Sequence, residues 1–370
     1  PNGAETAFVY DAMGNILHGE DALGQTMDYA YDAAGQLIRQ TDAEGNETAY
    51  EYDSMGRLVK ETNALGGVTV YAYDSLDNLI SVTSPAGSSL TAVYDPVWNV
   101  PLTVTDPLGN VTSYTYDGGG RLTAVIYADG SQLAYAYDAL GRAVQVIQPS
   151  GLTTETSYDA VGNIVRVSDD ESRVYTYTYD GNGRLLTATD PLGGTETYTY
   201  DGAGNTVSVT DEEEHTTSYG YDAAGRLTQA VNALGEENQV RYDLAGRATA
   251  AVDGRGAESR TYYDAIGRPT VLEDALGNLT AYAYDRNGNT TQVTDALKGV
   301  TAYEYDALGR LVKMTDALGH ETLYAYDADG NVTRITLADG DTVEMTYDAA
   351  GQMLTLTDEA GVVTSYAYDS

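Results

Sequence analysis

The dipeptide Tyr-Asp returns along this chain at a nearly constant interval. It occurs 18 times, and of the 17 intervals between copies sixteen are 21 residues long and one is 22. A repeat of this length is one supersecondary unit that buries its apolar surface only against its neighbours. No change of composition and no linker interrupts the series. We therefore expect residues 1–370 to form a single domain of about 17 to 18 repeats. The tyrosines are Tyr10, Tyr31, Tyr52, Tyr73, Tyr94, Tyr116, Tyr137, Tyr158, Tyr179, Tyr200, Tyr221, Tyr242, Tyr263, Tyr284, Tyr305, Tyr326, Tyr347 and Tyr368.

Each repeat contains two turn motifs and two extended runs. In the repeat after Tyr305, Asp306-Ala-Leu-Gly309 and Asp316-Ala-Leu-Gly319 are separated by short runs of strand-forming residues. Asp at the first position of a tight turn caps its own backbone, and Gly at the fourth position adopts the positive φ that closes a hairpin. We call the turn that begins with the Asp of Tyr-Asp the first turn, and the other the second turn. Both are expected to reverse the chain.

The fourth turn position has a few exceptions. Gly is absent from two of 17 first turns, at Asp77 and Trp98, and from three of 17 second turns, at Ser172, Glu214 and Lys298. A residue other than Gly costs roughly 1 kcal/mol in the left-handed region. A long array sums its stability over many units and tolerates such costs, so we expect these turns to form as well.

The extended runs are rich in Thr, Val and Tyr, as in 174–179 and 195–200, and no helical periodicity competes with them. A β-solenoid with parallel pairing or an antiparallel meander of hairpins could host this period. Two hairpin-type turns per unit favour the meander. About 35 strands at ~4.8 Å spacing make a strip on the order of 165 Å long, which twist must roll up. The expected fold is all-β: antiparallel hairpin repeats in a long sheet rolled into a hollow spiral or wide barrel.

Tyrosine supplies nearly all aromatic rings, with 33 Tyr against one Phe and one Trp. This choice predicts rings with one edge in water and few thick cores. A second Tyr often stands two residues before Tyr-Asp and shares its strand face. After the first turn, apolar residues such as Leu122 and Val125 are three apart, which predicts opposite faces. Both faces of the sheet are therefore partly apolar, and the pattern does not decide which face points inward. The second aromatic residues are Phe8, Tyr29, Tyr50, Tyr71, Tyr114, Tyr135, Tyr177, Tyr198, Tyr219, Tyr282, Tyr303, Tyr324 and Tyr366.

The charge balance excludes several classes of partner. With 19 basic and 56 acidic residues the net charge is −37, which repels nucleic acid and anionic membranes. No run of 18 apolar residues predicts a transmembrane helix, and residues 1–10 do not have the pattern of a signal peptide. We expect an internal segment of a longer chain. The absence of Cys excludes disulfides and thiolate chemistry.

The motif Tyr-Asp-x-x-Gly-Arg-Leu resembles the YD or Rhs repeat. It is intact at 52–58, 116–122, 179–185, 221–227 and 305–311, and the repeat covers essentially the whole chain. That family includes bacterial polymorphic toxins, the shell component of insecticidal toxin complexes, and teneurins. The resemblance implies a hollow spiral β-sheet shell that can enclose a toxic domain, and it alone suggests such a cargo.

Many bacterial members end in an Asp-Pro-x-Gly-Leu segment that cleaves itself. Here Asp106-Pro-Leu-Gly109 is followed by Asn110, and Asp190-Pro-Leu-Gly193 by Gly194. Both segments are interpreted as ordinary second turns, where Pro at the second position is common.

No singular catalytic or cofactor site emerges. Consecutive turn aspartates should lie ~10 Å apart, near the spacing of an inverting glycosidase, but the pair recurs in every unit, so we interpret these residues as turn caps. The histidines His18, His215 and His320 lack metal-ligand spacing and are interpreted as solvated turn residues. We assign no catalytic, cofactor or metal-binding residue.

Two acidic turns leave an alternative open. Asp169–Glu171 and Asp211–Glu214 each break the Gly rule, but they are two units apart, roughly 20 Å, and cannot share an ion. A solvated acidic edge is favoured over a separate weak calcium site at either.

Arg follows the Gly of eight first turns, where it can pair with turn Asp or stack on Tyr, and we interpret it as structural. The residues are Arg57, Arg121, Arg142, Arg184, Arg226, Arg247, Arg268 and Arg310. The 22-residue interval contains Pro96, Trp98 and Pro101, and predicts a bulge or bend rather than a pocket on Trp98.

Two functions remain. The first is a non-enzymatic shell segment of a secreted or surface-exposed bacterial protein, whose partners are flanking domains or an enclosed toxin or effector. The second is a cell-surface carbohydrate-binding or adhesion module in which exposed Tyr rings stack on sugars. The open first and last strands also predict that the segment associates end to end.

Overall fold

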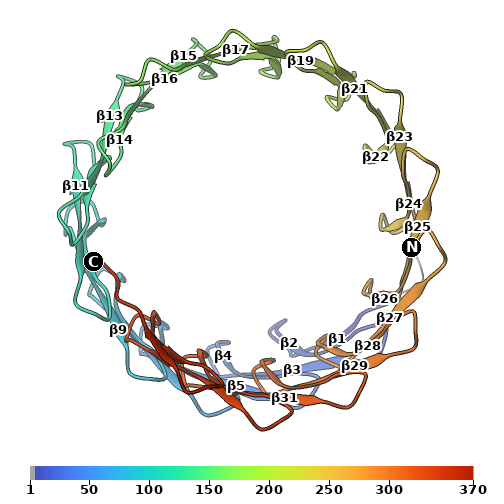
Figure 1. Cartoon of the computed structure of the whole chain (residues 1–370). Helices are drawn as coiled ribbons and strands as arrows, with labels where there is room; N and C mark the ends of the chain where they lie inside the picture. Colours follow the sequence, from blue (N-terminus) through green and yellow to red (C-terminus); the bar gives the residue numbers. More distant parts are fainter. Residues whose placement is uncertain (1–4, 370) are drawn as a thin grey trace. The chain divides into compact units, whose positions relative to one another are not determined.

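The computed structural model describes residues 5–369, and every regular element in that range is a β-strand (Figure 1). The strands belong to one antiparallel sheet. Packing divides the chain into two compact units: unit 1 joins the residues up to Thr112 to those from Thr261 onward, and unit 2 contains Ser113–Arg260. The fold is therefore all-β and antiparallel, as the repeat predicts.

The strands of unit 1 come from both ends of the chain. They are β1 (Ala7–Tyr10), β2 (Ile16–Glu20), β3 (Thr26–Tyr31), β4 (Leu37–Thr41), β5 (Glu47–Tyr52), β6 (Leu58–Thr62), β7 (Val68–Tyr73), β8 (Leu79–Thr83), β9 (Ser89–Tyr94) and β10 (Pro101–Thr105), then β26 (Pro269–Glu273), β27 (Leu279–Tyr284), β28 (Thr290–Thr294), β29 (Val300–Tyr305), β30 (Leu311–Thr315), β31 (Glu321–Tyr326), β32 (Val332–Thr336), β33 (Thr342–Tyr347), β34 (Met353–Thr357) and β35 (Val363–Ser365).

The strands of unit 2 are consecutive. They are β12 (Leu122–Ile126), β13 (Gln132–Tyr137), β14 (Ala143–Ile147), β15 (Thr153–Tyr158), β16 (Ile164–Asp169), β17 (Val174–Tyr179), β18 (Leu185–Thr189), β19 (Thr195–Tyr200), β20 (Thr206–Thr210), β21 (Thr216–Tyr221), β22 (Leu227–Val231), β23 (Glu237–Tyr242) and β24 (Ala248–Val252). The unit boundaries fall within β11 (Val111–Tyr116) and β25 (Glu258–Tyr263).

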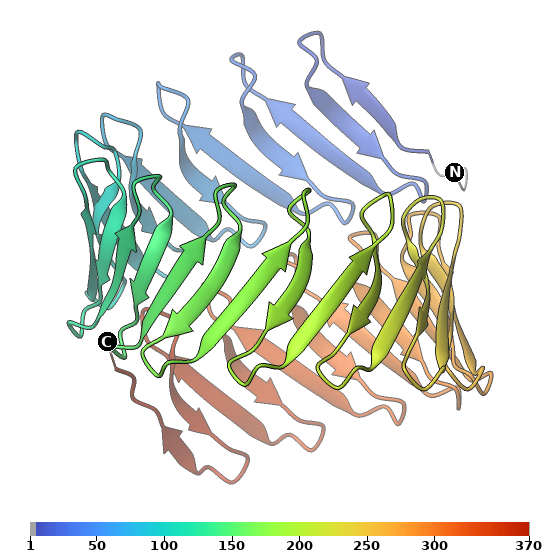
Figure 2. The same cartoon turned by 90° about the horizontal axis from the view of Figure 1, so that it is seen from above.

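Consecutive strands pair antiparallel, so the chain is a meander. Tyr221 on β21 and Tyr242 on β23 lie on alternate strands, with β22 paired to both. A parallel solenoid is thereby excluded. Figure 2 shows the hairpins of unit 2 (green to yellow) with turns along two opposite edges of the sheet. Because first and second turns alternate along the meander, first turns lie along one edge and second turns along the other.

Each turn forms as the Asp and Gly positions predict. In the turn after Tyr305, Gly309 N donates to Asp306 O at 2.9 Å, and Asp306 N donates to Arg310 O at 2.9 Å. The Asp306 carboxylate accepts from Leu308 N at 2.9 Å and Arg310 N at 3.0 Å. Gly309 has φ 74°, the left-handed conformation that a tight reversal requires.

Among the described residues, five residues other than Gly adopt positive φ. Four of them are the predicted residues: Asp77 (φ 67°), Ser172 (64°), Glu214 (67°) and Lys298 (70°). The fifth is Asn99 (φ 55°), not Trp98. The additional residue of the 22-residue repeat lies inside the turn, where Asn99 N donates to Asp95 O at 3.0 Å and Asp95 N to Val100 O at 2.8 Å. The predicted bulge or bend is thus an enlarged turn, and Trp98 is half exposed on it.

We expect Ser172→Gly, Glu214→Gly and Lys298→Gly each to raise the free energy of unfolding by up to about 1 kcal/mol, because Gly removes the left-handed backbone strain. Asp77→Gly should raise the free energy of unfolding by less. Arg57 Nη1 donates to Asp77 Oδ1 at 2.9 Å, and this hydrogen bond would be lost. Urea denaturation followed by circular dichroism measures the four variants. A loss of stability in the first three would contradict the role assigned to this turn position.

A bulge in the first-turn hairpins decides which residues share a face. On β11 and β12, Tyr116 pairs with Leu122 but Thr115 pairs with Ala124, so Thr123 is the additional residue. The same shift recurs in hairpins such as β17–β18 and β19–β20. Tyr114 pairs with Val125. Leu122 and Val125 therefore lie on the face of the paired tyrosines, and the expectation of opposite faces is wrong because it assumed an unbroken strand. We call this side the Tyr face.

The sheet is one layer thick and has no dry core. Among the described residues no side chain is below 2% exposure, and the buried apolar residues are small or few: Ala124, Ala250 and Met345. This confirms the expectation of few thick cores. Stability must then come from links between neighbouring strands and repeats.

Within unit 1, two segments far apart in sequence meet turn to turn. Ser84 Oγ and Ala86 N donate to the Asp329 carboxylate at 2.8 and 2.9 Å. Arg286 N donates to Glu44 Oε1 at 2.9 Å, and Asn287 Nδ2 to Asp42 Oδ2 at 2.6 Å. Second turns of the amino-terminal segment thus face first turns of the carboxyl-terminal segment. We call these contacts the seam.

Candidate functional site

The residues that repeat in the motif converge at the first turns. Asp138 shows the arrangement: its Oδ1 accepts from Leu140 N at 2.8 Å and Arg142 N at 3.0 Å, and its Oδ2 accepts from Arg142 Nε at 2.7 Å. The carboxylate therefore caps the turn and fixes the guanidinium. This arrangement confirms the interpretation of the turn aspartates as caps.

The same Arg connects its repeat to the following one. Arg142 lies 4.6 Å from the centre of the Tyr158 ring and donates to Asp159 O at 3.1 Å. The Tyr158 hydroxyl in turn donates to Ala143 O at 2.8 Å. Arg and Tyr thus bridge consecutive repeats in both directions, which confirms a structural role for the Arg. Equivalent stacking joins Arg57 to Tyr73, Arg121 to Tyr137, Arg184 to Tyr200, Arg226 to Tyr242, Arg268 to Tyr284 and Arg310 to Tyr326.

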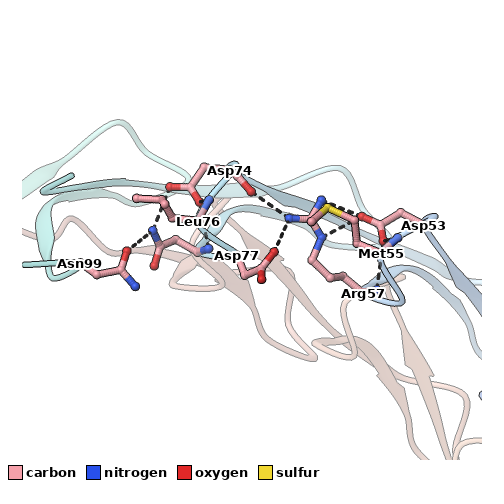
Figure 3. Close-up of polar contacts among 8 residues, drawn as sticks. Asp53, Met55, Arg57, Asp74, Leu76, Asp77 and Asn99 are labelled. Carbon is pink, nitrogen blue, oxygen red and sulfur yellow. Dashed lines mark hydrogen bonds and ion pairs between the residues drawn. The ribbon is translucent and has the colours of Figure 1, made fainter. Parts of the chain in front are cut away.

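Figure 3 shows how the link continues where Arg is absent. Arg57 Nη1 donates to Asp74 O at 2.8 Å. In the next turn Asn78 replaces Arg, and its Nδ2 donates to Asp74 Oδ2 at 2.9 Å and to Asn99 Oδ1 at 2.6 Å. This role of Asn is not evident from the motif, although Asn recurs at the same turn position, as in Asn163 and Asn205.

Hydrogen bonds to the turn carboxylates favour their charged form. The Arg57 backbone and guanidinium lower the pKa of Asp53 below its ordinary value of 3.8. For Asp201 the Asn205 side chain has the largest effect, and it also lowers the pKa. A group whose pKa is lowered on folding stabilises the fold above its unfolded value, and this stabilisation is lost as pH falls through the folded value.

We therefore expect the urea midpoint of unfolding to fall as pH decreases from about 4 toward 2, because many turn carboxylates become protonated over that window. Protonation also relieves the repulsion of a net charge of −37, which acts in the opposite direction. Raising the salt concentration screens that repulsion more than the short turn contacts. A midpoint that does not decrease below pH 4 in high salt would contradict the capping role.

The histidines all contact aspartates, but His18 lies in strand β2, so the interpretation as a turn residue is wrong for His18. His18 Nδ1 lies 2.6 Å from Asp28, His215 Nδ1 3.2 Å from Asp211, and His320 Nδ1 2.9 Å from Asp316. One turn brings ligand atoms of Asp211, Glu213 and His215 within 4.8 Å of one another. Spacing rules for helices and loops missed this group, because a tight turn folds alternate residues onto one side. The group lies on an exposed turn, where acidic residues are common without a metal.

The other acidic turn has a counter-ion. Arg173 contacts Asp169 at 2.6 Å and Glu171 at 3.3 Å, which neutralises part of the charge that calcium would need. The segments beginning at Asp106 and Asp190 have ordinary second-turn geometry, with the carboxylates accepting from Leu108 N at 2.9 Å and Leu192 N at 2.8 Å. In residues 5–369 no helix has the length and hydropathy needed to cross a membrane.

Two family comparisons match the chain. The Teneurin YD-shell family matches residues 145–298 and 261–369, and the RHS Repeat family matches residues 31–68, 56–89 and 101–132. No curated protein matches the sequence.

Solved structures share the fold at low sequence identity. A crystal structure of TcdB2-TccC3-Cdc42 has a TM-score of 0.73 and 15% identity, over 98% of this chain and 26% of that chain. The Photorhabdus luminescens Tc holotoxin pore has a TM-score of 0.61 and 15% identity, over 96% of this chain and 23% of that chain. This chain spans about a quarter of the length of the structures it matches.

Proposed function

Because this chain belongs to the Teneurin YD-shell family, we propose that it is a non-enzymatic wall segment of a shell that encloses or displays a toxin or effector domain lying outside these residues. The observation that carries the proposal is the use of the repeated motif. In first turns that carry Arg, the Asp, Arg and Tyr groups bind the turn itself or a neighbouring repeat, as Asp138, Arg142 and Tyr158 do. These groups build a wall rather than a reaction centre.

Two further features support this function. The sheet is one layer thick, which is expected of a wall rather than of a domain built around a core. The fold is shared with TcdB2-TccC3 structures. By analogy with a Tc holotoxin, we propose a bacterial protein that is secreted or exposed at the cell surface.

No observation favours the carbohydrate-binding alternative. The Tyr200 hydroxyl donates to Leu185 O at 2.7 Å, and the Tyr198 hydroxyl bonds to Glu196, which together with burial raises the pKa of Tyr198 to about 12. These hydroxyls are therefore engaged within the sheet. A glycan array comparing the native segment with Tyr198→Ala tests the alternative, and sugar binding that disappears in the variant would support it.

Protease protection tests the enclosure. A protease site is placed in the domain adjoining this segment in the longer chain, and the same site is placed next to Leu192, which is 95% exposed on a second turn. We expect rapid cleavage beside Leu192 and slow cleavage in the adjoining domain. If that domain is cleaved as fast as the isolated domain, it is not enclosed by the shell. Display of the domain outside the wall would then be the remaining form of the proposal.

A further inference from the structure

One second turn of the seam takes its cap from another segment. The first residue of a second turn is usually Asp or Asn, whose side chain accepts the backbone N–H two residues on, as Asp106 does from Leu108 N at 2.9 Å. Ser84 is the one Ser at this position. In its turn Ala86 N donates to Asp329 Oδ1 at 2.9 Å, and Ser84 Oγ donates to the other oxygen of that carboxylate at 2.8 Å. The carboxylate that normally belongs to the turn is therefore supplied across the seam.

Other second turns that begin with neither Asp nor Asn are capped from within. They begin at Tyr127, Gln148 and Leu337, and the third residue of each turn is polar. These third residues are Asp129, Ser150 and Asp339, which accept from the backbone N of Ser131, Leu152 and Asp341 at 2.7, 3.4 and 3.1 Å. The third residue of the Ser84 turn is Ala86, which has no polar side chain. This turn therefore depends on the seam where the other three depend on themselves.

Asp329 is as exceptional among the first turns as Ser84 is among the second turns. It is the one acidic residue at the third position of the 17 complete first turns. Two single departures from the repeat pattern, 245 positions apart, thus contact each other. Asp42 and Asn287 are separated by the same 245 positions and lie two repeats away along both rows of turns. Both pairs belong to one alignment of the two rows.

The repeat itself does not specify this alignment, because rows of nearly identical turns can also meet one repeat earlier or later, a shift of about 10 Å. One shift places Asp329 opposite Asp106, with carboxylate facing carboxylate. The opposite shift places Ser84 opposite Ala350, whose side chain has no acceptor, and separates Ala86 N from Asp329. Like charges and unpaired polar groups in the wrong alignments are what make one alignment specific.

We propose that Ser84 and Asp329 determine the register of the seam. The pair selects one alignment between two rows of similar turns, and the contact of Asp42 with Asn287 reinforces it. The role assigned to the pair is to decide which repeats of the wall meet. It holds whether or not the wall encloses another domain.

Ser84→Asp separates this role from the stability of the turn. By the repeat pattern alone the substitution supplies the missing cap and should strengthen the turn. At the seam it removes the hydroxyl donor and places a second carboxylate opposite Asp329, so we expect the native register to be weakened. Adding Asp329→Asn restores an amide opposite a carboxylate, as in the contact of Asn287 with Asp42, and should recover the register.

Cross-linking of introduced cysteines measures the register, because the 370-residue chain has no Cys. Glu44→Cys is combined with Arg286→Cys to report the native alignment, and with Ala307→Cys or Ala265→Cys to report the two shifted ones. Glu44 is a neutral reporter, since Arg286 offers it only a backbone N–H, which does not select a register. With a short bis-methanethiosulfonate reagent, the native pair should cross-link about ten-fold more than either shifted pair. Ser84→Asp should remove most of this preference, and Ser84→Asp/Asp329→Asn should restore it.

Two further variants complete the test. Gln148→Asp makes the same kind of change in a second turn of unit 2, which does not belong to the seam, and should leave the cross-linking unchanged. Asp329→Ala removes the acceptor without adding charge and should also reduce the native cross-link, so the test does not rest on Ser84→Asp alone. Circular dichroism confirms that each variant is folded.

Three results would overturn the proposal. The first is a native chain in which a shifted pair cross-links as well as the native pair. The second is an unchanged preference in both Ser84→Asp and Asp329→Ala. The third is a preference that is lost in Ser84→Asp and not recovered when Asp329→Asn is added, which would show that the two residues do not act as a pair.

Discussion

Val240→Pro is expected to lower the free energy of unfolding by about 3 kcal/mol. Val240 lies inside β23, opposite Ala251 of β24, in a strand that is paired on both sides. Proline removes a ladder hydrogen bond and fixes φ where the strand needs an extended value. A second sheet would limit such damage by packing on the strand, but this sheet is one layer thick. Urea denaturation followed by circular dichroism measures the loss.

The matched control places proline in a neighbouring turn. Ala233 is the second residue of the second turn that begins at Asn232, the position that Pro107 and Pro191 occupy in other repeats. Ala233→Pro should therefore be neutral or stabilise by up to about 1 kcal/mol. If both prolines lower the free energy of unfolding equally, the placement of Val240 in a strand and of Ala233 in a turn would be contradicted.

Tyr200→Ala is expected to lower the free energy of unfolding by about 3 kcal/mol, and Tyr200→Phe is expected to lower it by about 1 kcal/mol. The first change removes the ring on which Arg184 stacks at 4.7 Å, and both remove the hydroxyl that donates to Leu185 O at 2.7 Å. Since these contacts join consecutive repeats, hydrogen exchange should speed up most in β18 and β19. Urea denaturation gives the energies.

Tyr175→Ala serves as the comparison, because Tyr175 is 40% exposed and does not belong to a Tyr-Asp dipeptide. It should cost clearly less than Tyr200→Ala. If the two substitutions prove equally costly, the Tyr-Asp rings are not the main link between repeats.

The local features of the fold follow from the sequence, because each is encoded within one repeat. The Asp and Gly positions predict the two turns, and four of the five residues other than Gly with positive φ stand where the pattern places them. The meander follows from two reversals per unit. The structural role of Arg142 was also foreseeable, since its position recurs beside Asp and Tyr.

The bulge, the enlarged turn and the seam could not be predicted from the 21-residue repeat. The bulge at Thr123 reverses the alternation of faces, and nothing in the residue types marks it. Asn99 replaces Trp98 at positive φ because the enlarged turn places the reversal one residue later. The contact of Asp329 with Ser84 joins residues 245 positions apart. Each of these two residues departs from the repeat pattern only by a single substitution.

The bulge has a consequence for how such a chain can change its length. A 21-residue unit is odd, and in strict alternation an odd unit would turn its side chains over. The bulge adds the step that returns each unit to the same orientation, so duplication or loss of one whole unit in the gene leaves every other unit facing as before. A single inserted residue is harmless only inside a turn, which is where the 22-residue repeat carries it. Length can therefore vary in whole units while the wall keeps its two sides.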